Sequence, residues 1–254
     1  MKLALIQSDI VWEDKNANIK QLEQYIEQIK SDVSIILLPE MFTTGFTMQS
    51  EKYAETMDGE TVLWMKKQAK SKNALIIGSV IILELGKYYN RLILAFPDGH
   101  LKHYNKKHLF TMGEEPKHYS AGNEPLEFEY LGLKIKAIIC YDLRFPVWCR
   151  NASNYDLLIC VANWPEVRSY PWRQLLIARA IENQCYVAAV NRVGLDGNNI
   201  NHSGNSMVVD AKGEVLQEMV TTAGIIIQQI DLELLKQFRM QFPVLKDQDA
   251  FSFE

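Results

Sequence analysis

The chain has 254 residues, of which 48% are hydrophobic and 23% are charged, so it contains enough apolar material for a large folded core. Its 27 basic and 31 acidic residues are spread along the sequence and give a net charge of -4, which argues against a nucleic-acid partner because phosphate binding requires a basic patch. The apolar runs are far shorter than the ~18–20 residues that a membrane span requires, so a soluble protein is expected.

Short apolar runs alternate with stretches of helical period from the N-terminus onward. Residues 3–8 predict a strand, and the apolar positions Ile19, Leu22, Ile26 and Ile29 predict a helix after it. Further strands are predicted at 33–38, 75–83, 88–96, 133–139, 157–162, 186–190, 207–209, 215–219 and 225–230, and further helices at 61–69 and 175–183. Interleaved elements of both kinds predict an α/β fold.

Two turn sequences indicate hairpins between neighbouring strands. Pro97-Asp98-Gly99 and Ala211-Lys212-Gly213 each lie between strand candidates, so the sheets are expected to be mixed rather than purely parallel. No Pro-rich or Gly-rich linker and no internal repeat divides the chain, which predicts a single domain over residues 1–254. The polar residues from about 243 to 254 show no period and are expected to form a short docking tail.

The four cysteines are Cys140, Cys149, Cys160 and Cys185, and their spacing contains no C-x-x-C pair. Neither a zinc site nor a disulfide framework is therefore predicted. The apolar N-terminal stretch ends at Gln7, too early for a secretory signal, so reduced thiols and a cytoplasmic location are expected. Three of the four read as packing residues, and because no Gly-rich phosphate loop is present either, no metal and no cofactor is predicted.

Three predicted strands are followed by polar or reactive side chains, namely Glu40, Cys140 and Asn163. Ligands of open α/β sheets bind beyond the carboxyl ends of the strands, where these side chains are expected to project. Taken alone, each has a simpler interpretation, since an isolated cysteine is usually a buried apolar residue and Glu40 could begin a helix. Their convergence on strand ends predicts a shared site.

A basic stretch that includes Lys106, Lys107 and His108 lies between Glu40 and Cys140. On composition alone it is a solvated loop. A lysine ammonium beside a cysteine, however, keeps the thiol as thiolate and can face the oxyanion that forms when a carbonyl is attacked. A contact between His108 and Cys140 would instead indicate a Cys–His hydrolase, although the local context of a cysteine protease is missing.

At these residues the sequence resembles the nitrilase-like carbon-nitrogen hydrolases, whose triad is a glutamate, a lysine and a cysteine in that order. The matching segments are Leu37-Leu38-Pro39-Glu40-Met41-Phe42, Lys106-Lys107-His108-Leu109-Phe110, Cys140-Tyr141-Asp142-Leu143-Arg144-Phe145-Pro146, Asn163-Trp164-Pro165, Trp172 and residues 178–183 and 191–194. The sequence is most similar to the ω-amidase branch, which hydrolyses the side-chain amide of 2-oxo acids such as 2-oxoglutaramate and 2-oxosuccinamate. The resemblance implies a cofactor-free αββα sandwich of two mixed sheets, usually paired as a homodimer.

The resemblance also implies a role for each matched position. Glu40 would be the general base and Cys140 the nucleophile that forms a thioester. Lys106, rather than its neighbour Lys107, matches the family lysine. The Lys106 ammonium and the backbone N–H of Tyr141 would hold the oxyanion.

A second glutamate of the family matches Glu115, which we prefer to Glu114 because of its spacing to Gly122. It would orient Lys106 or share its proton. The alternative for both glutamates is a pair of solvated loop residues.

Substrate binding is expected to involve an arginine, because a 2-oxo acid presents a carboxylate. Arg144 is the first candidate, with an ion pair to Asp142 as its structural alternative, and Arg168 is the second. Aromatic residues near the strand ends would form an apolar wall, although such residues are more often core. The expected wall consists of Phe42, Phe46 and Trp164.

The leading functional prediction is an amidase for small ω-amides of 2-oxo dicarboxylic acids. Hydrolysis of an N-carbamoyl acid or of another small aliphatic amide is the alternative within the same family, because the triad fixes only the acyl chemistry. A binding module that keeps the fold without turnover belongs to a different class. It would require a broken triad, and all matched positions are intact.

Overall fold

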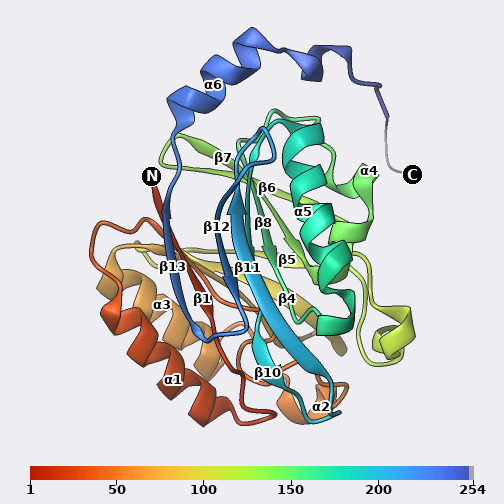
Figure 1. Cartoon of the computed structure of the whole chain (residues 1–254). Coiled ribbons are helices and arrows are strands. Elements are labelled where there is room, and N and C mark those ends of the chain that lie inside the picture. The colour runs from red at the N-terminus through yellow and green to blue at the C-terminus, as the bar shows by residue number, and fades with distance from the viewer. Residues whose placement is uncertain (252–254) are drawn as a thin grey trace.

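The computed structural model of the chain describes residues 1–251, and within them two mixed β-sheets lie face to face between outer helices (Figure 1). The six-stranded first sheet has the order β13-β1-β2-β3-β4-β5, and the second has the order β10-β11-β9-β8-β7-β6 with β12 paired to β11. This arrangement confirms the predicted α/β sandwich.

The strands of the first sheet are β1 (Lys2–Gln7), β2 (Ile35–Leu37), β3 (Leu75–Glu84), β4 (Lys87–Ala95), β5 (Leu101–Asn105) and β13 (Gly224–Gln229). Those of the second are β6 (Leu126–Tyr130), β7 (Leu133–Ile139), β8 (Leu157–Val161), β9 (Tyr186–Val190), β10 (Val193–Leu195), β11 (Asn201–Val209) and β12 (Val215–Val220). The helices are α1 (Lys15–Gln28), α2 (Ser50–Tyr53), α3 (Glu60–Lys72), α4 (Pro146–Cys149), α5 (Ser169–Asn183) and α6 (Leu232–Gln241).

Strand β1 shows how the sequence builds this layering. Leu3 and Leu5 pack in the cluster between the two sheets, whereas Ala4 and Ile6 pack in the cluster that the first sheet forms with α1 and α3. Alternate side chains of a strand point to opposite faces, so a strand that is apolar at every position is buried on both sides.

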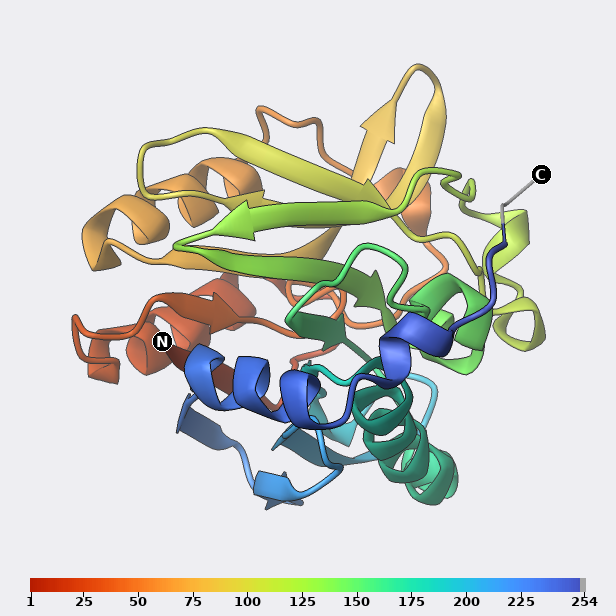
Figure 2. The ribbon, with the colours of Figure 1, turned by 90° about the horizontal axis from the view of Figure 1, so that it is seen from above.

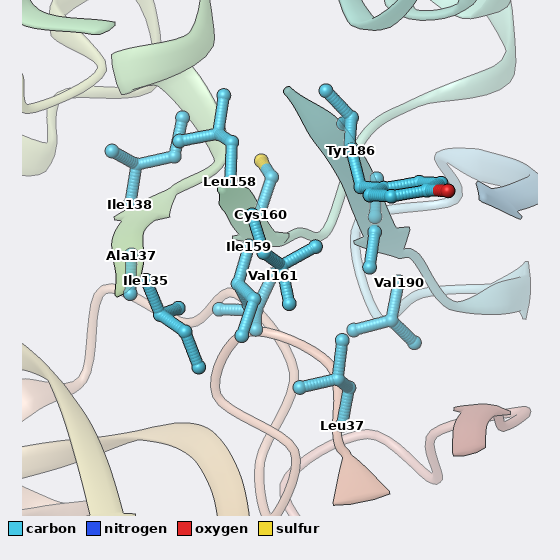
Figure 3. Packing of buried hydrophobic residues seen from close by; sticks show 14 of the residues in the cluster. Leu37, Ile135, Ala137, Ile138, Leu158, Ile159, Cys160, Val161, Tyr186 and Val190 are labelled. Atoms are coloured by element: carbon cyan, nitrogen blue, oxygen red, sulfur yellow. The ribbon is translucent and has the colours of Figure 1, made fainter. Parts of the chain in front are cut away.

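The second sheet follows the same rule. In Figure 3, Ile159 and Val161 of β8 point toward Leu37 of the first sheet, while Leu158 and Cys160 point the other way. Cys160 is fully buried, in agreement with its interpretation as a packing residue.

Helices α1 and α3 flank the first sheet and α5 flanks the second (Figure 1). Helix α1 begins where the Asp14 side chain accepts a hydrogen bond from the backbone N–H of Ala17 at 3.0 Å. Its buried side chains Leu22 and Ile26 lie on one face, as the apolar period predicts. Both predicted hairpins are present, between β4 and β5 and between β11 and β12.

Helix α6 lies over one end of the sandwich (Figure 2). After it, the short 3-10 turn Val244–Asp247 leads into residues that line a shallow pocket beside Val147 of α4 and Glu182 of α5. This is the segment expected to dock, and its residues 252–254 lie outside the described part. Within residues 1–251 no helix is long and apolar enough to cross a membrane, and no group of His, Cys, Asp or Glu side chains is arranged to hold a metal ion.

Candidate active site

The carboxyl ends of strands from both sheets meet at one pocket of about 330 Å³. Glu40 follows β2 and Lys106 follows β5 in the first sheet, whereas Cys140 follows β7 and Asn163 follows β8 in the second. All four line the pocket. The structure therefore brings together the glutamate, lysine and cysteine that the sequence singled out.

The Glu40 carboxylate is completely buried and is hydrogen-bonded through both oxygens. Its Oε1 accepts from Lys106 Nζ at 2.9 Å and from Asn90 Nδ2 at 2.8 Å. Its Oε2 accepts from the backbone N–H of Asn163 at 2.8 Å, and the Asn163 side-chain amide donates to the Glu40 carbonyl. Because Asn163 belongs to the other sheet, these bonds fix the carboxylate across the sheet interface.

The Lys106 side chain is also completely buried, and it contacts two carboxylates. Its Nζ donates to both oxygens of Glu115, at 3.1 and 3.0 Å, in addition to Glu40. Burial alone lowers the pKa of Lys106, but the charges of Glu115 and Glu40 outweigh it and raise the pKa above its usual value. Lys106 is therefore a permanent cation in the site.

Glu115 is buried and forms an ion pair with Lys106, whereas Glu114 is exposed and pairs with Lys117 at the surface. Glu115 Oε2 also accepts from the backbone N–H of Phe110 at 2.5 Å, so one carboxylate holds both the lysine and a residue of the pocket wall. Burial raises the pKa of Glu115, with Lys106 opposing and the Glu40 charge adding to the increase.

Cys140 begins a 3-10 turn, Cys140–Arg144, directly after β7, and its backbone has φ 46°. This left-handed conformation is unusual for cysteine and turns the chain sharply toward the pocket. Burial raises the pKa of the Cys140 thiol well above its usual value, the Glu40 charge adds to that, and Lys106 only partly compensates. These effects together favour the thiol form of Cys140 over the thiolate.

Asp142, which the sequence suggested only as an ion-pair partner for Arg144, anchors the turn that carries Cys140. Its carboxylate accepts from the backbone N–H of Ile139 at 3.0 Å and from the Tyr104 hydroxyl at 2.7 Å. It also binds the backbone N–H and Nδ1 of His108, at 2.9 and 2.8 Å. His108 is thus engaged by Asp142 and does not line the pocket, so the geometry does not support a Cys–His pair.

Both candidate arginines line the pocket, each over an aromatic ring. The Arg144 guanidinium lies 4.9 Å from the centre of the Trp164 ring, and that of Arg168 lies 5.3 Å from the centre of the Phe110 ring. The alternative ion pair between Arg144 and Asp142 does not form within the described residues. Trp164 and Tyr141 line the pocket as well.

Phe42 lies elsewhere, and its expected place in the pocket wall is wrong. The chain turns at Met41, which has φ 42°, and this directs Phe42 into the core between the first sheet and α3. There its ring packs 5.9 Å from the ring of Trp64 and is fully buried. Phe46, further along the same loop, does line the pocket.

Three further residues of the site escaped sequence reasoning. Asn90 lies in β4 beside Glu40, between Tyr89 and Arg91, and the adjacent charged residue made its polar side chain a weak signal in the sequence. Asp196, directly after β10, and His202, in β11, also line the pocket and had no such signal. Burial lowers the pKa of His202 to about 4, so its ring is neutral.

The chain is similar in sequence and in structure to known proteins. The profile of a family described as carbon-nitrogen hydrolase matches residues 2–240. The omega-amidase YafV of Escherichia coli is 43% identical over 99% of this chain and 98% of its own, and a 2-oxoglutaramate amidase of Bacillus subtilis is 37% identical over 96% of each. A solved CN-hydrolase superfamily protein of Xanthomonas campestris, with an arsenic adduct in its active site, superposes with a TM-score of 0.98 at 40% identity, covering 100% of this chain and 99% of its own.

Proposed function

The chain belongs to the carbon-nitrogen hydrolase family, and we propose that it is an ω-amidase that converts 2-oxoglutaramate and 2-oxosuccinamate to the 2-oxo acids and ammonia. The observation that carries this proposal is the buried Glu40, Lys106 and Cys140 set in one pocket, in a chain 43% identical to an omega-amidase.

The first half of the reaction forms a thioester. Glu40 takes the proton of the Cys140 thiol as the sulfur attacks the amide carbonyl, because a thiol with a raised pKa requires a base at the moment of attack. The Lys106 ammonium and the backbone N–H of Tyr141 stabilise the oxyanion of the tetrahedral intermediate. Glu40 then returns the proton to the leaving nitrogen, and ammonia departs as the C–N bond breaks.

The second half releases the product. Glu40 removes a proton from water, the resulting hydroxide attacks the thioester carbonyl, and the C–S bond breaks as the proton returns to Cys140. Lys106 stays protonated throughout, since two carboxylates hold its proton. Glu115 keeps Lys106 in place during both halves.

The substrate carboxylate binds the arginine side of the pocket. The Arg144 guanidinium lies over the Trp164 ring, and its planar fork of donors suits a bidentate contact with a carboxylate. Arg168 supplies additional positive charge from the turn Glu166–Arg168. Trp164 and Phe46 provide the apolar wall for the short carbon chain.

The same proposal includes the setting in which the enzyme works. Residues 1–254 form one catalytic domain with a docking tail from about residue 243, and two copies of the chain pair as a homodimer. The four free cysteines support a reducing compartment, the cytoplasm, because Cys140 must remain a thiol.

Ammonia release from 2-oxoglutaramate by Cys140→Ala tests the proposal. We expect turnover to disappear while the thermal unfolding temperature changes little. A slow amide substrate should add the mass of one acyl group to the wild-type enzyme and none to the variant. Full turnover by Cys140→Ala would refute the triad, and a preference for an N-carbamoyl acid in a parallel substrate panel would refute the substrate.

A further inference from the structure

The two buried carboxylates of the site require hydrogen-bond donors in addition to Lys106. Glu40, Lys106 and Glu115 have fully buried side chains, so one cation faces two carboxylates away from water. A buried carboxylate is costly unless hydrogen bonds satisfy its oxygens. Besides Lys106, the Asn90 side chain donates to both carboxylates, since its Nδ2 lies 2.8 Å from Glu40 Oε1 and 3.3 Å from Glu115 Oε1.

Asn90 contacts the lysine as well as the two carboxylates. Its backbone carbonyl accepts the backbone N–H of Lys106 at 3.0 Å. A side-chain amide carries two hydrogens on its nitrogen, one for each carboxylate. Asn90 in β4 therefore ties together residues that arrive from β2, from β5 and from the loop after β5.

In this orientation the Asn90 amide leaves its own oxygen without a hydrogen bond from any described residue, which supports a role for its nitrogen. Asn90 Oδ1 is buried and has no hydrogen-bond partner within residues 1–251. The reversed amide would direct Oδ1 at two carboxylates, which repel it. A buried acceptor without a partner is destabilising, so the residue keeps this orientation for the contacts of its nitrogen.

We propose that Asn90 is a positioning residue for the thioester chemistry: its amide bridges Glu40 and Glu115 and directs the Glu40 carboxylate toward Cys140. This inference rests on the proposed function. The other titratable groups that face Glu40 are Lys106, Glu115, Cys140 and the buried Tyr119, whose hydroxyl donates to the Thr47 carbonyl.

Asn90→Asp tests the proposal because it keeps the side-chain shape and replaces the donor by an acceptor. The carboxylates then hold protons more tightly, and since the free enzyme requires an ionised Glu40, the acid limb of kcat/KM moves to higher pH. We expect a shift of about one pH unit and a roughly 10- to 100-fold lower kcat at neutral pH with KM little changed. Asn90→Ser, which retains one hydroxyl donor and adds no charge, should shift the limb in the same direction by less.

Asn151→Asp is the matched control. Asn151 is equally buried, but its amide binds the Tyr155 and Asn183 carbonyls outside the pocket. We expect it to lower the unfolding temperature and to leave the acid limb in place. The pH at which the acid limb of kcat/KM falls does not depend on the fraction of folded enzyme. This measurement therefore distinguishes a folding defect from a positioning defect. Unshifted limbs in both Asn90 variants, or an equal shift in Asn151→Asp, would overturn the proposal.

A second measurement does not depend on the substrate. Iodoacetamide alkylates Cys140 when its sulfur bonds to the reagent carbon, iodide leaves and Glu40 takes the thiol proton. Peptide mass spectrometry follows this site alone, and the rate against pH should show the same shift in Asn90→Asp. Alkylation of wild-type Cys140 without hydrolysis of 2-oxoglutaramate would refute the proposed substrate and leave the role of Asn90 testable.

Discussion

At the scale of single residues, the charge of Lys106 decides whether the site can exist. Its ammonium is the cation that Glu40 and Glu115 share, and all three side chains are fully buried. Neighbouring Lys107 is different, because it is partly exposed and donates to Asn123 at 3.0 Å. The sequence distinguished the two lysines only through the family resemblance, and the structure gives the physical difference between them.

Lys106→Met leaves two buried carboxylates without their cation. We expect a loss of about 3–5 kcal/mol in the free energy of unfolding at pH 7. Without the cation the folded-state pKa of Glu115 rises further above its unfolded value, so the variant takes up protons on folding and the loss becomes smaller as the pH falls. Urea unfolding at pH 7 and pH 5 measures this. Lys107→Met should cost less than about 1 kcal/mol at both pH values, and an equal loss in both variants would contradict the assignment.

Arg144→Met separates the two candidate arginines. The loss of a charged hydrogen bond to the substrate carboxylate should lower kcat/KM for 2-oxoglutaramate about 10- to 100-fold, mainly through KM. Hydrolysis of an uncharged amide of similar length should change little. Arg168→Met is the comparison, with a smaller expected effect; if it alone raises KM, Arg168 is the carboxylate ligand instead.

At the scale of elements, the Glu13 carboxylate helps to hold the loop that carries Phe46 and Met48 into the pocket. Glu13 accepts hydrogen bonds from Thr47 Oγ1 at 2.5 Å, Gln49 Nε2 at 2.9 Å and Tyr53 Oη at 2.9 Å. These donors lie on the loop and on the helix α2 that follows it. Glu13 therefore stabilises the loop that forms one wall of the pocket, although Glu13 itself does not line the pocket.

Glu13→Gln replaces one of the accepting oxygens by a donor and should loosen this loop. We expect a loss of about 1 kcal/mol in stability and a severalfold higher KM with kcat largely retained, because Phe46 and Met48 line the pocket while the triad stays in place. Steady-state kinetics and thermal unfolding measure both effects. A fall in kcat at unchanged KM would show that the loop acts on the chemistry rather than on binding.

Elements with a strong apolar pattern could be predicted from the sequence, and weakly apolar ones could not. Strands β3, β7 and β8 are buried along nearly their whole length, and their ranges agree closely with prediction. Helix α6 escaped notice because only Leu235 is buried, and Arg239 anchors it through a 2.8 Å bond to Asp156. Phe42 was misplaced for a related reason: its direction depends on the backbone turn at Met41, which residue type does not reveal.

At the scale of the whole molecule, the site lies across the interface of two separately built sheets. Glu40 and Lys106 come from the first sheet, Cys140 and Asn163 from the second, and the bonds between Glu40 and Asn163 join them. The strand ends made this convergence predictable. The relative position of the sheets was not, because it depends on the packing of the apolar cluster between them.

The outer helices expose apolar side chains that support the proposed homodimer. Val147 of α4 is 53% exposed, and Tyr170 and Ile181 of α5 are 76% and 51% exposed. Light scattering should give twice the 29.2 kDa mass of the chain. Ile181→Glu should shift the mass toward the monomer, whereas Leu131→Glu, at the turn between β6 and β7, should not. A monomeric wild-type protein would refute the dimer.

Strand β13 pairs with β1 in the first sheet, with Gln229 opposite Lys2, while β12 just before it pairs with β11 in the second. On the ribosome, β1 is made first, yet its edge stays open until residue 229 has emerged. The nascent chain therefore carries an unpaired strand edge for most of its synthesis, a feature that favours association with other chains. A chain shortened before β13 should accordingly aggregate rather than keep partial activity, and the pairing of β13 with β1 serves as the closing step of folding.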